Sequence, residues 1–166
     1  GMLGKILKVE VGTGPNKQVM PPAPQPGEKA PAEVDYDMWV GPSADFAYDP
    51  RVFHFHWRWH MNFGGGMLLD WVCHHPDIAA WAMAKDAEFP VSVEGTGKLC
   101  EGPWDTHAAY DYTVGYADGF KMSVSSSFMG MRFIGEKGEL FVTRGKQTCS
   151  VPGLWEKDLG PDAWRC

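Results

Sequence analysis

Short strand-like segments separated by turn residues fill the second half of the chain and constrain its fold most strongly. After Pro90 the sequence predicts strands at residues 91–95, 107–116, 120–127, 131–134 and 139–143. Turn residues at 117–119 and 136–138 join consecutive strands through short connections, which favour antiparallel pairing. The sequence therefore predicts an α+β fold, in which an open, mostly antiparallel β-sheet carries helices on one face.

The first half of the chain is less regular. Residues 5–12 alternate between apolar and polar side chains and predict one more half-buried strand. Residues 13–50 hold most of the thirteen prolines and predict a long Pro-rich loop, because proline cannot join a sheet interior. With 166 residues, we expect a single α+β domain over residues 2–166, truncated at both ends. Residues 149–166 carry no clear structural signal.

The segment from Val52 to His60 alternates between two kinds of side chain. If this segment is extended, aromatic rings face one way and basic side chains face the other. The aromatic set is Phe53, Phe55, Trp57 and Trp59, and the basic set is His54, His56, Arg58 and His60. The basic face leads directly into three glycines, so we expect it to lie close to the residues that follow them.

Three consecutive glycines at 64–66 precede a helical pattern over residues 67–85. On one continuous helix, Asp70, His74 and Asp77 would share a face. A carboxylate one turn before an imidazole is a common way to orient a histidine that moves protons. The alternative interpretation is structural, with Asp70 capping the helix and His74 half-buried in the core. Pro76 predicts a kink or a restart within this pattern.

Composition and charge argue against several classes of partner. The formal net charge of −6 disfavours nucleic-acid and anionic-membrane binding, which need basic surfaces. No apolar run approaches the ~20 residues that span a bilayer. The four cysteines lack paired spacing, so we expect reduced thiols and a cytoplasmic location; they are Cys73, Cys100, Cys149 and Cys166.

The sequence leaves alternatives to an enzyme open. Three histidines, His54, His56 and His60, could hold zinc or iron in a free-standing metal-binding β protein. The Trp-rich loops could instead bind another protein. A dinucleotide fingerprint is missing, because the glycines at 95–97 follow a strand but no helix follows them.

The glycine-to-helix segment resembles a known signature. The three glycines, the Asp70-x-x-x-His74 pair, Asp77 and Trp81 resemble the C-terminal domain of the Gfo/Idh/MocA family of NAD(P)-dependent oxidoreductases, in a MocA-like subgroup. Further segments resemble the same domain, at residues 4–14, 35–42, 58–59, 93–97 and 133–140. The resemblance implies a fold like the C-terminal domain of dihydrodipicolinate reductase, without the family's N-terminal Rossmann domain.

The resemblance also implies a function. Family members transfer hydride between NAD or NADP and a sugar, polyol or related compound. Asp70 and His74 match the catalytic pair, with His74 as the proton acid/base. The substrate side would comprise Arg58, Trp59, His60 and Asp77, the last with a mainly structural role.

The missing Rossmann domain shapes the remaining expectations. We expect this chain to bind no cofactor and to be inactive alone, with the missing Rossmann domain as its partner and a homo-oligomer formed through the sheet face. An NAD-dependent glycosidase domain of the same family is the alternative.

Overall fold

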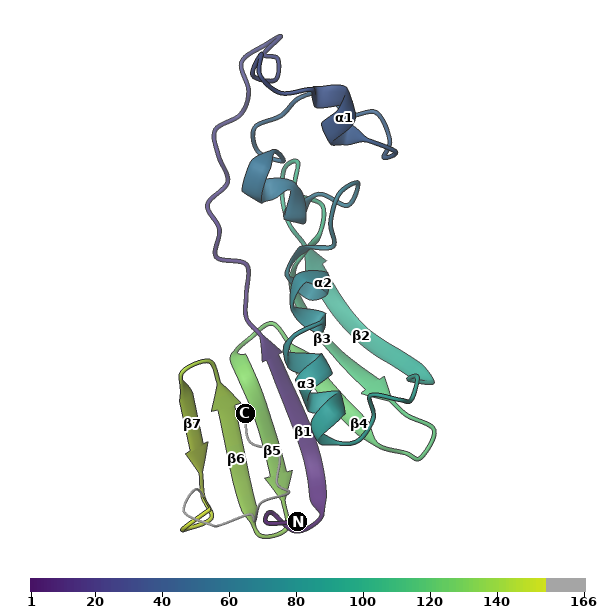
Figure 1. Ribbon diagram of the computed structural model, residues 1–166, viewed down its shortest axis with the longest axis vertical. Helices are drawn as coiled ribbons and strands as arrows, with labels where there is room; N and C mark the ends of the chain where they lie inside the picture. Colours follow the sequence, from purple (N-terminus) through teal and green to yellow (C-terminus); the bar gives the residue numbers. More distant parts are fainter. Residues whose placement is uncertain (155–166) are drawn as a thin grey trace.

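A computed structural model describes residues 1–154, and a mixed sheet is its main element (Figure 1). The sheet has seven strands in the order β2-β3-β4-β1-β5-β6-β7. Their bounds are β1 (Ile6–Thr13), β2 (Ser92–Leu99), β3 (His107–Gly115), β4 (Lys121–Ser125), β5 (Met129–Gly135), β6 (Gly138–Thr143) and β7 (Lys146–Cys149). The predicted α+β class and the predicted strands are confirmed, whereas β7 was missed.

The first strand lies at the centre of the sheet, between partners that come late in the chain. It pairs antiparallel with β5, where Val9 lies opposite Phe133, and parallel with β4, where Val9 lies opposite Met122. All other pairings are antiparallel between consecutive strands. The parallel pair was not predicted, because sequence-local turn signals do not report a contact between strands so distant in the chain.

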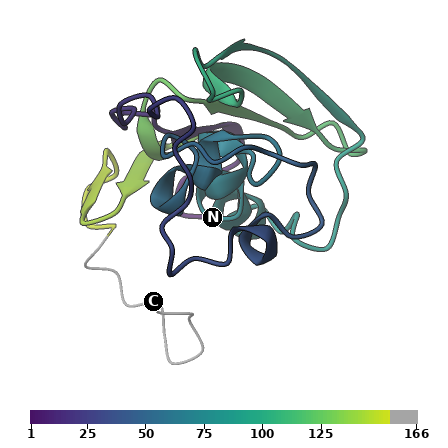
Figure 2. The same ribbon diagram turned by 90° about the horizontal axis from the view of Figure 1, so that it is seen from above.

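Two short helices, α2 (Gly66–Val72) and α3 (His75–Ala82), cover one face of the sheet. Viewed from above, the sheet curves around them (Figure 2). The helical pattern predicted over 67–85 forms two helices, because the chain breaks at Cys73 and His74. The restart near Pro76 is confirmed, since that proline lies in the first turn of α3, where a missing N–H costs no hydrogen bond.

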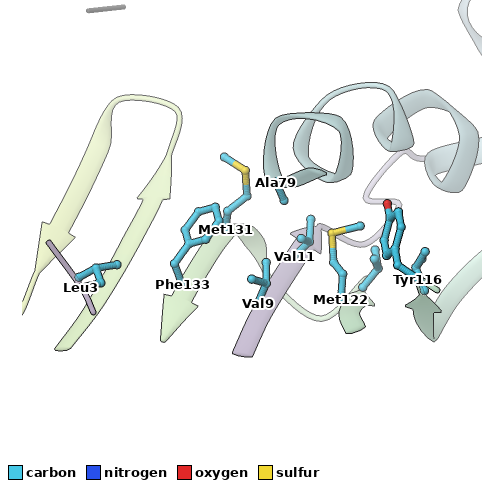
Figure 3. Close-up of a cluster of buried hydrophobic side chains, with 10 residues drawn as sticks. Leu3, Val9, Val11, Ala79, Tyr116, Met122, Met131 and Phe133 are labelled. Atoms are coloured by element: carbon cyan, nitrogen blue, oxygen red, sulfur yellow. The ribbon is translucent and has the colours of Figure 1, made fainter. Parts of the chain in front are cut away.

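The main core lies between these helices and the central strands. Buried side chains from the four central strands, together with Ala79 of α3, form one cluster (Figure 3). Its fully enclosed members include Val9, Val11 and Val124, with exposed fractions of 0 to 1%. Strand alternation directs these residues toward the helices and their neighbours toward the opposite face.

The opposite face of the sheet is polar and carries ion pairs across strands. Glu10 of β1 binds Lys8 and also Arg132 of β5, at 3.2 Å in the second case. Arg132 in turn binds Glu139 of β6 at 2.9 Å. The side-chain hydrogen bond from Lys8 is the largest contribution that lowers the pKa of Glu10. Charged side chains on this face therefore form ion pairs with one another within the chain.

Residues 34–63 form an aromatic lobe beyond one end of the sheet (Figure 1). The helix α1 (Tyr36–Val40) begins there, capped by the Asp35 carboxylate, which accepts a hydrogen bond from Met38 N at 3.0 Å. Aromatic rings contact one another throughout the lobe, within centroid distances of 4.6 to 6.3 Å; they include Tyr36, Trp39, Phe46, Tyr48, Phe53 and Phe63. Part of the predicted Pro-rich loop is therefore packed by aromatic contacts.

The extended conformation predicted for residues 52–60 is wrong. Residues His54–Trp59 form a 3₁₀ helix, η1, whose turns are closed by local backbone hydrogen bonds such as His56 N to Phe53 O at 3.0 Å. A 3₁₀ helix has three residues per turn, so alternating residues do not share a face. The alternation of aromatic and basic residues indicates the two-residue period of a strand, but the segment has the three-residue period of a 3₁₀ helix. The predicted face of histidines therefore does not form.

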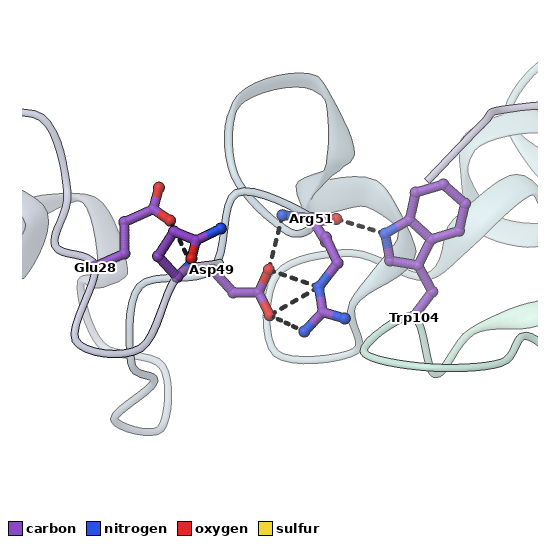
Figure 4. A network of polar contacts seen from close by, with 5 residues as sticks. Glu28, Asp49, Arg51 and Trp104 are labelled. Atoms are coloured by element: carbon purple, nitrogen blue, oxygen red, sulfur yellow. Dashed lines mark hydrogen bonds and ion pairs between the residues drawn. The ribbon is translucent and has the colours of Figure 1, made fainter. Parts of the chain in front are cut away.

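A polar network attaches the aromatic lobe to the loop between β2 and β3 (Figure 4). Asp49 accepts hydrogen bonds from the Arg51 guanidinium at 2.6 to 3.1 Å and from the Arg51 backbone at 2.8 Å. Trp104 Nε1 donates to the Arg51 carbonyl at 2.5 Å. Burial alone would raise the pKa of Asp49, but the hydrogen bonds from Arg51 outweigh burial and lower it.

We expect the Phe133→Ala variant to lose about 3–5 kcal/mol of unfolding free energy, because it removes a large core side chain. Phe133 is 7% exposed, whereas Phe89 is 91% exposed and serves as the matched control. The Phe89→Ala variant should change stability by less than about 0.5 kcal/mol. Urea denaturation followed by circular dichroism measures both. Equal losses in the two variants would contradict the assigned core.

The Asp49–Arg51 pair predicts a pH-dependent contribution to stability. Because the folded-state pKa of Asp49 lies below its ordinary 3.8, the contribution is present above that value and is lost as pH falls through the folded-state pKa. At pH 6 we expect Asp49→Asn to cost about 1 kcal/mol of unfolding free energy. This cost should shrink below pH 4 in urea titrations. The exposed Asp45 provides the control variant Asp45→Asn, which should change stability by less than about 0.5 kcal/mol.

Candidate functional site

The three glycines position α2 through close approaches that other residues would block. Gly66 has φ +64°, and a Cβ atom there would lie 2.5 Å from Thr106 Oγ1. A Cβ atom on Gly64 would lie 3.0 Å from backbone atoms of Arg58. Thr106 is itself buried in the loop before β3. The glycines therefore allow the start of α2 to pack against both η1 and the loop before β3. A residue with a Cβ atom at position 64 or 66 would block this packing.

Arg58 of η1 and Asp70 of α2 form the polar centre of the candidate site. Arg58 Nε lies 3.7 Å from Asp70 Oδ1, and these side chains are 28% and 42% exposed. The Arg58 guanidinium also donates to the Phe55 carbonyl at 3.2 Å and lies over the Phe55 and Trp57 rings, 4.6 and 4.8 Å from their centroids. Arg58 is therefore oriented by several contacts and is half-buried, while Asp70 is exposed to solvent.

The adjacent histidines His74 and His75 have opposite environments. His75 is 2% exposed, and its Nδ1 lies 2.6 Å from the Gly12 carbonyl oxygen of β1. A carbonyl can only accept, so His75 Nδ1 carries a proton and donates it. His74 is exposed and occupies the N-cap position of α3, with φ −113° and ψ −89°. His75 is therefore a structural residue, and His74 is the histidine available to a ligand.

The break between α2 and α3 corrects the predicted geometry of the Asp70–His74 pair. Because His74 lies outside both helices, the two side chains do not share one face of a continuous helix, and the same holds for Asp77 on α3. Asp70 pairs with Arg58 instead, and His74 packs against Trp71 with ring centroids 5.4 Å apart. Asp70 and His74 both remain exposed, four residues apart in the chain.

Trp71 connects the two histidines to a residue that the sequence did not indicate. Its ring contacts His74 and His75, and the Arg144 guanidinium lies 4.9 Å from its centroid. Arg144 lies in the turn between β6 and β7, which are the last two strands in the sheet order. No local pattern could place it here, because only the folded sheet brings that turn to α2. Arg144 therefore brings a positive charge to the Trp71 ring, which also contacts His74.

Two predicted substrate residues are instead part of the protein interior. Trp59 is 2% exposed and packs with Val52 and Trp104, and its carbonyl accepts backbone hydrogen bonds from Asp105 and Thr106. His60 is 9% exposed, and its ring contacts Phe46 and Phe63 in the aromatic lobe. Neither side chain is open to a ligand in this conformation. Their location corrects the expectation from sequence that they line the substrate side.

Asp77 lies apart from this region, at a cleft between the helices and the outer strands. The cleft has a volume of about 610 Å³ and lies between α2–α3 and β2–β3. Its walls are mainly apolar, and Asp77, Tyr112 and His107 supply polar groups. Burial raises the pKa of Tyr112 to about 12, so its hydroxyl stays protonated. Asp77 therefore faces a different part of the surface from Asp70 and Arg58.

The histidines of η1 do not gather into a metal site. Each one contacts aromatic rings: His54 contacts Phe53, His56 contacts Trp104, and His60 contacts Phe46. Within residues 1–154, no group of three or more His, Cys, Asp or Glu side chains is placed to hold a metal ion. Burial lowers the pKa of His56, which favours its neutral form.

A comparison with protein families decides the class of this domain. A family model described as "Oxidoreductase family, C-terminal alpha/beta domain" matches residues 1–157. The chain belongs to the Gfo/Idh/MocA oxidoreductase family. It corresponds to the C-terminal domain of that family, in agreement with the resemblance of its glycine and Asp–His segments. A search of curated proteins finds no match to the chain.

The glycines at 95 and 97 do not form the turn of a dinucleotide-binding fold. Dinucleotides bind where a glycine-rich turn joins a parallel strand to a helix N-terminus. Here the glycines at 95 and 97 lie inside β2, which pairs antiparallel with β3.

Residues 1–154 contain no helix long and apolar enough to cross a bilayer.

We expect the two adjacent histidines to respond differently to replacement by alanine. The His75→Ala variant leaves the Gly12 carbonyl without its buried donor, so it should lose at least about 1–3 kcal/mol of unfolding free energy. The His74→Ala variant should stay within about 0.5 kcal/mol of the parent chain, because its side chain is exposed. Thermal and urea unfolding measure both variants. A larger loss for His74→Ala would reverse the structural and functional assignments.

Proposed function

We propose that this chain is the substrate-side domain of an NAD(P)-dependent oxidoreductase that acts on a sugar, polyol or related hydroxy compound. The observation that supports this function is the Arg58–Asp70 ion pair between η1 and α2, followed in the chain by the exposed His74 at the break before α3. It lies in the segment where the chain carries the family's Asp-x-x-x-His signature. In this proposal Asp70 and His74 are the catalytic residues.

The chemistry of the three groups suits a substrate that carries hydroxyl groups. The His74 imidazole can take a proton from a substrate hydroxyl or return one, since its ring forms no hydrogen bond with the backbone of residues 1–154. Asp70 can accept hydrogen bonds from neighbouring substrate hydroxyls. Arg58 can donate to a substrate oxygen from a position fixed by its contacts with Phe55 and Trp57.

Arg144 adds a positive charge next to the Trp71 ring. With Arg58 and His74 it makes the region suited to substrates that carry an oxygen-rich or acidic group, such as sugar acids. We therefore rank polyols and sugar acids as the first substrates to test. We also propose that Asp77 supports the α3 end of this region rather than contacting substrate, because it faces the separate cleft.

The nicotinamide cofactor, NAD or NADP, would be held by a Rossmann domain that is not among these 166 residues. The present domain would then bind and orient substrate, without turnover of its own. The described cysteines, Cys73, Cys100 and Cys149, are free thiols, which is consistent with a reducing compartment such as the cytoplasm.

Kinetics of an enzyme assembled with a family Rossmann domain test this proposal. We expect His74→Ala to lower kcat by about 10²–10⁴-fold, as for loss of a general acid–base, and to leave the Kd of NAD(P)H unchanged. Asp70→Asn should lower kcat/KM in the same assay. Asp86→Asn, at an exposed aspartate between α3 and β2, serves as the control and should be neutral. Unchanged turnover in His74→Ala would refute the assignment of this histidine.

A further inference from the structure

The strand β2 forms a long exposed edge of the sheet. It lies first in the strand order and pairs with β3, and all eight of its residues, Ser92–Leu99, are exposed. Within residues 1–154 no strand lies on its outer side. The opposite edge, β7, has four residues and begins with a lysine. A long edge without proline is a template for another strand, whereas a short, charged edge is not.

The side chains of β2 are self-complementary in one antiparallel register. If two copies pair about Thr96, Glu94 of each copy lies opposite Lys98 of the other. In the same register Val93 lies opposite Leu99 on the other face of the strand. Opposite charges and apolar pairs directly across strands are the contacts that stabilise antiparallel pairing. A slip of one residue would place charged side chains opposite apolar or glycine positions.

Within residues 1–154, the side chains that this register pairs are exposed on β2. Neither Glu94 nor Lys98 belongs to an ion pair among residues 1–154. Val93 and Leu99 are 62% and 53% exposed. By contrast, the charged residues on the open face of the central strands bind one another. The strand therefore presents two charges without an ion-pair partner in residues 1–154, together with two apolar side chains, in a pattern that a second copy would complement.

We propose that two copies of this chain associate through their β2 strands, antiparallel and centred on Thr96, to form one sheet across a two-fold axis. Such an interface is isologous, so each contact occurs twice. Val93 and the glycines of β2 also line the cleft beside α2 and α3. Leu99 of the second copy then lies beside Val93 and extends that apolar wall. This edge is a separate surface from the open sheet face, and it does not rest on the proposed catalytic role.

Reversal of charge at two positions tests the register directly. Glu94→Lys and Lys98→Glu each convert both Glu–Lys pairs into like-charge pairs, so each should weaken the dimer about tenfold or more. The double variant Glu94→Lys/Lys98→Glu restores opposite charges and should return within about threefold of the parent Kd. Sedimentation equilibrium of the full 166-residue chain measures each Kd. Lys146→Glu on β7 is the control and should leave the dimer unchanged.

A cysteine at the two-fold axis supplies an independent readout. Thr96→Cys lies opposite itself in this register and should form an intermolecular disulfide under mild oxidation, at a yield above that of the parent chain. Gln147→Cys on β7 should not. A monomeric parent chain at millimolar concentration would overturn the proposal. So would a dimer whose Kd is unaffected by Glu94→Lys, because it would have to form through another surface, such as the open face.

Discussion

The hydrogen bond between His75 and the Gly12 carbonyl is the contact on which the functional region depends. It joins the start of α3 to β1, the central strand of the sheet, at 2.6 Å within the buried interior. Because a buried carbonyl without a donor is costly, this bond fixes where α3 begins. The break before α3 then follows, and it places His74 on the surface next to Trp71.

The same constraint explains how one short segment can be both structural and available to a ligand. His75 faces the sheet and His74 faces solvent, because consecutive residues at a helix start point in different directions. Arg58 reaches the region from η1, which is held in place by the buried Trp59 behind it. The aromatic lobe thus contributes to the site by holding the backbone of η1, which carries Arg58. Most rings of the lobe contact one another.

The sheet was largely predictable from the sequence, since alternation and turn residues are local signals. The strand around Val124 and the turn at Asp118 and Gly119 needed no knowledge of the rest of the chain. Pairing between β1 and β4 depends on distant contacts, and no local signal reports it. The segment around Trp57 has the alternating pattern of a strand but forms a 3₁₀ helix. Local backbone hydrogen bonds and ring contacts stabilise this helix, and the alternating pattern does not report them.

The site was predictable in its residue types but not in its geometry. Asp70, His74 and Arg58 are predicted from the alternation, the spacing and the family signature, and the fold exposes Asp70 and His74 and leaves Arg58 half-buried. Their arrangement was not, because the helix break separates Asp70 from His74. Arg144 could not be found from the sequence, since its contact with Trp71 exists only after the β6–β7 turn is folded against α2.

Mapping of ligand contacts by two-dimensional NMR on the full chain tests the central claim most directly. Titration with a panel of polyols and sugar acids should shift the signals of Arg58, Asp70, Trp71, His74 and Arg144 together. We expect saturable shifts confined to this group for at least one compound in the panel. Saturable shifts confined to the cleft between β2–β3 and the helices, or to the aromatic lobe, would contradict it.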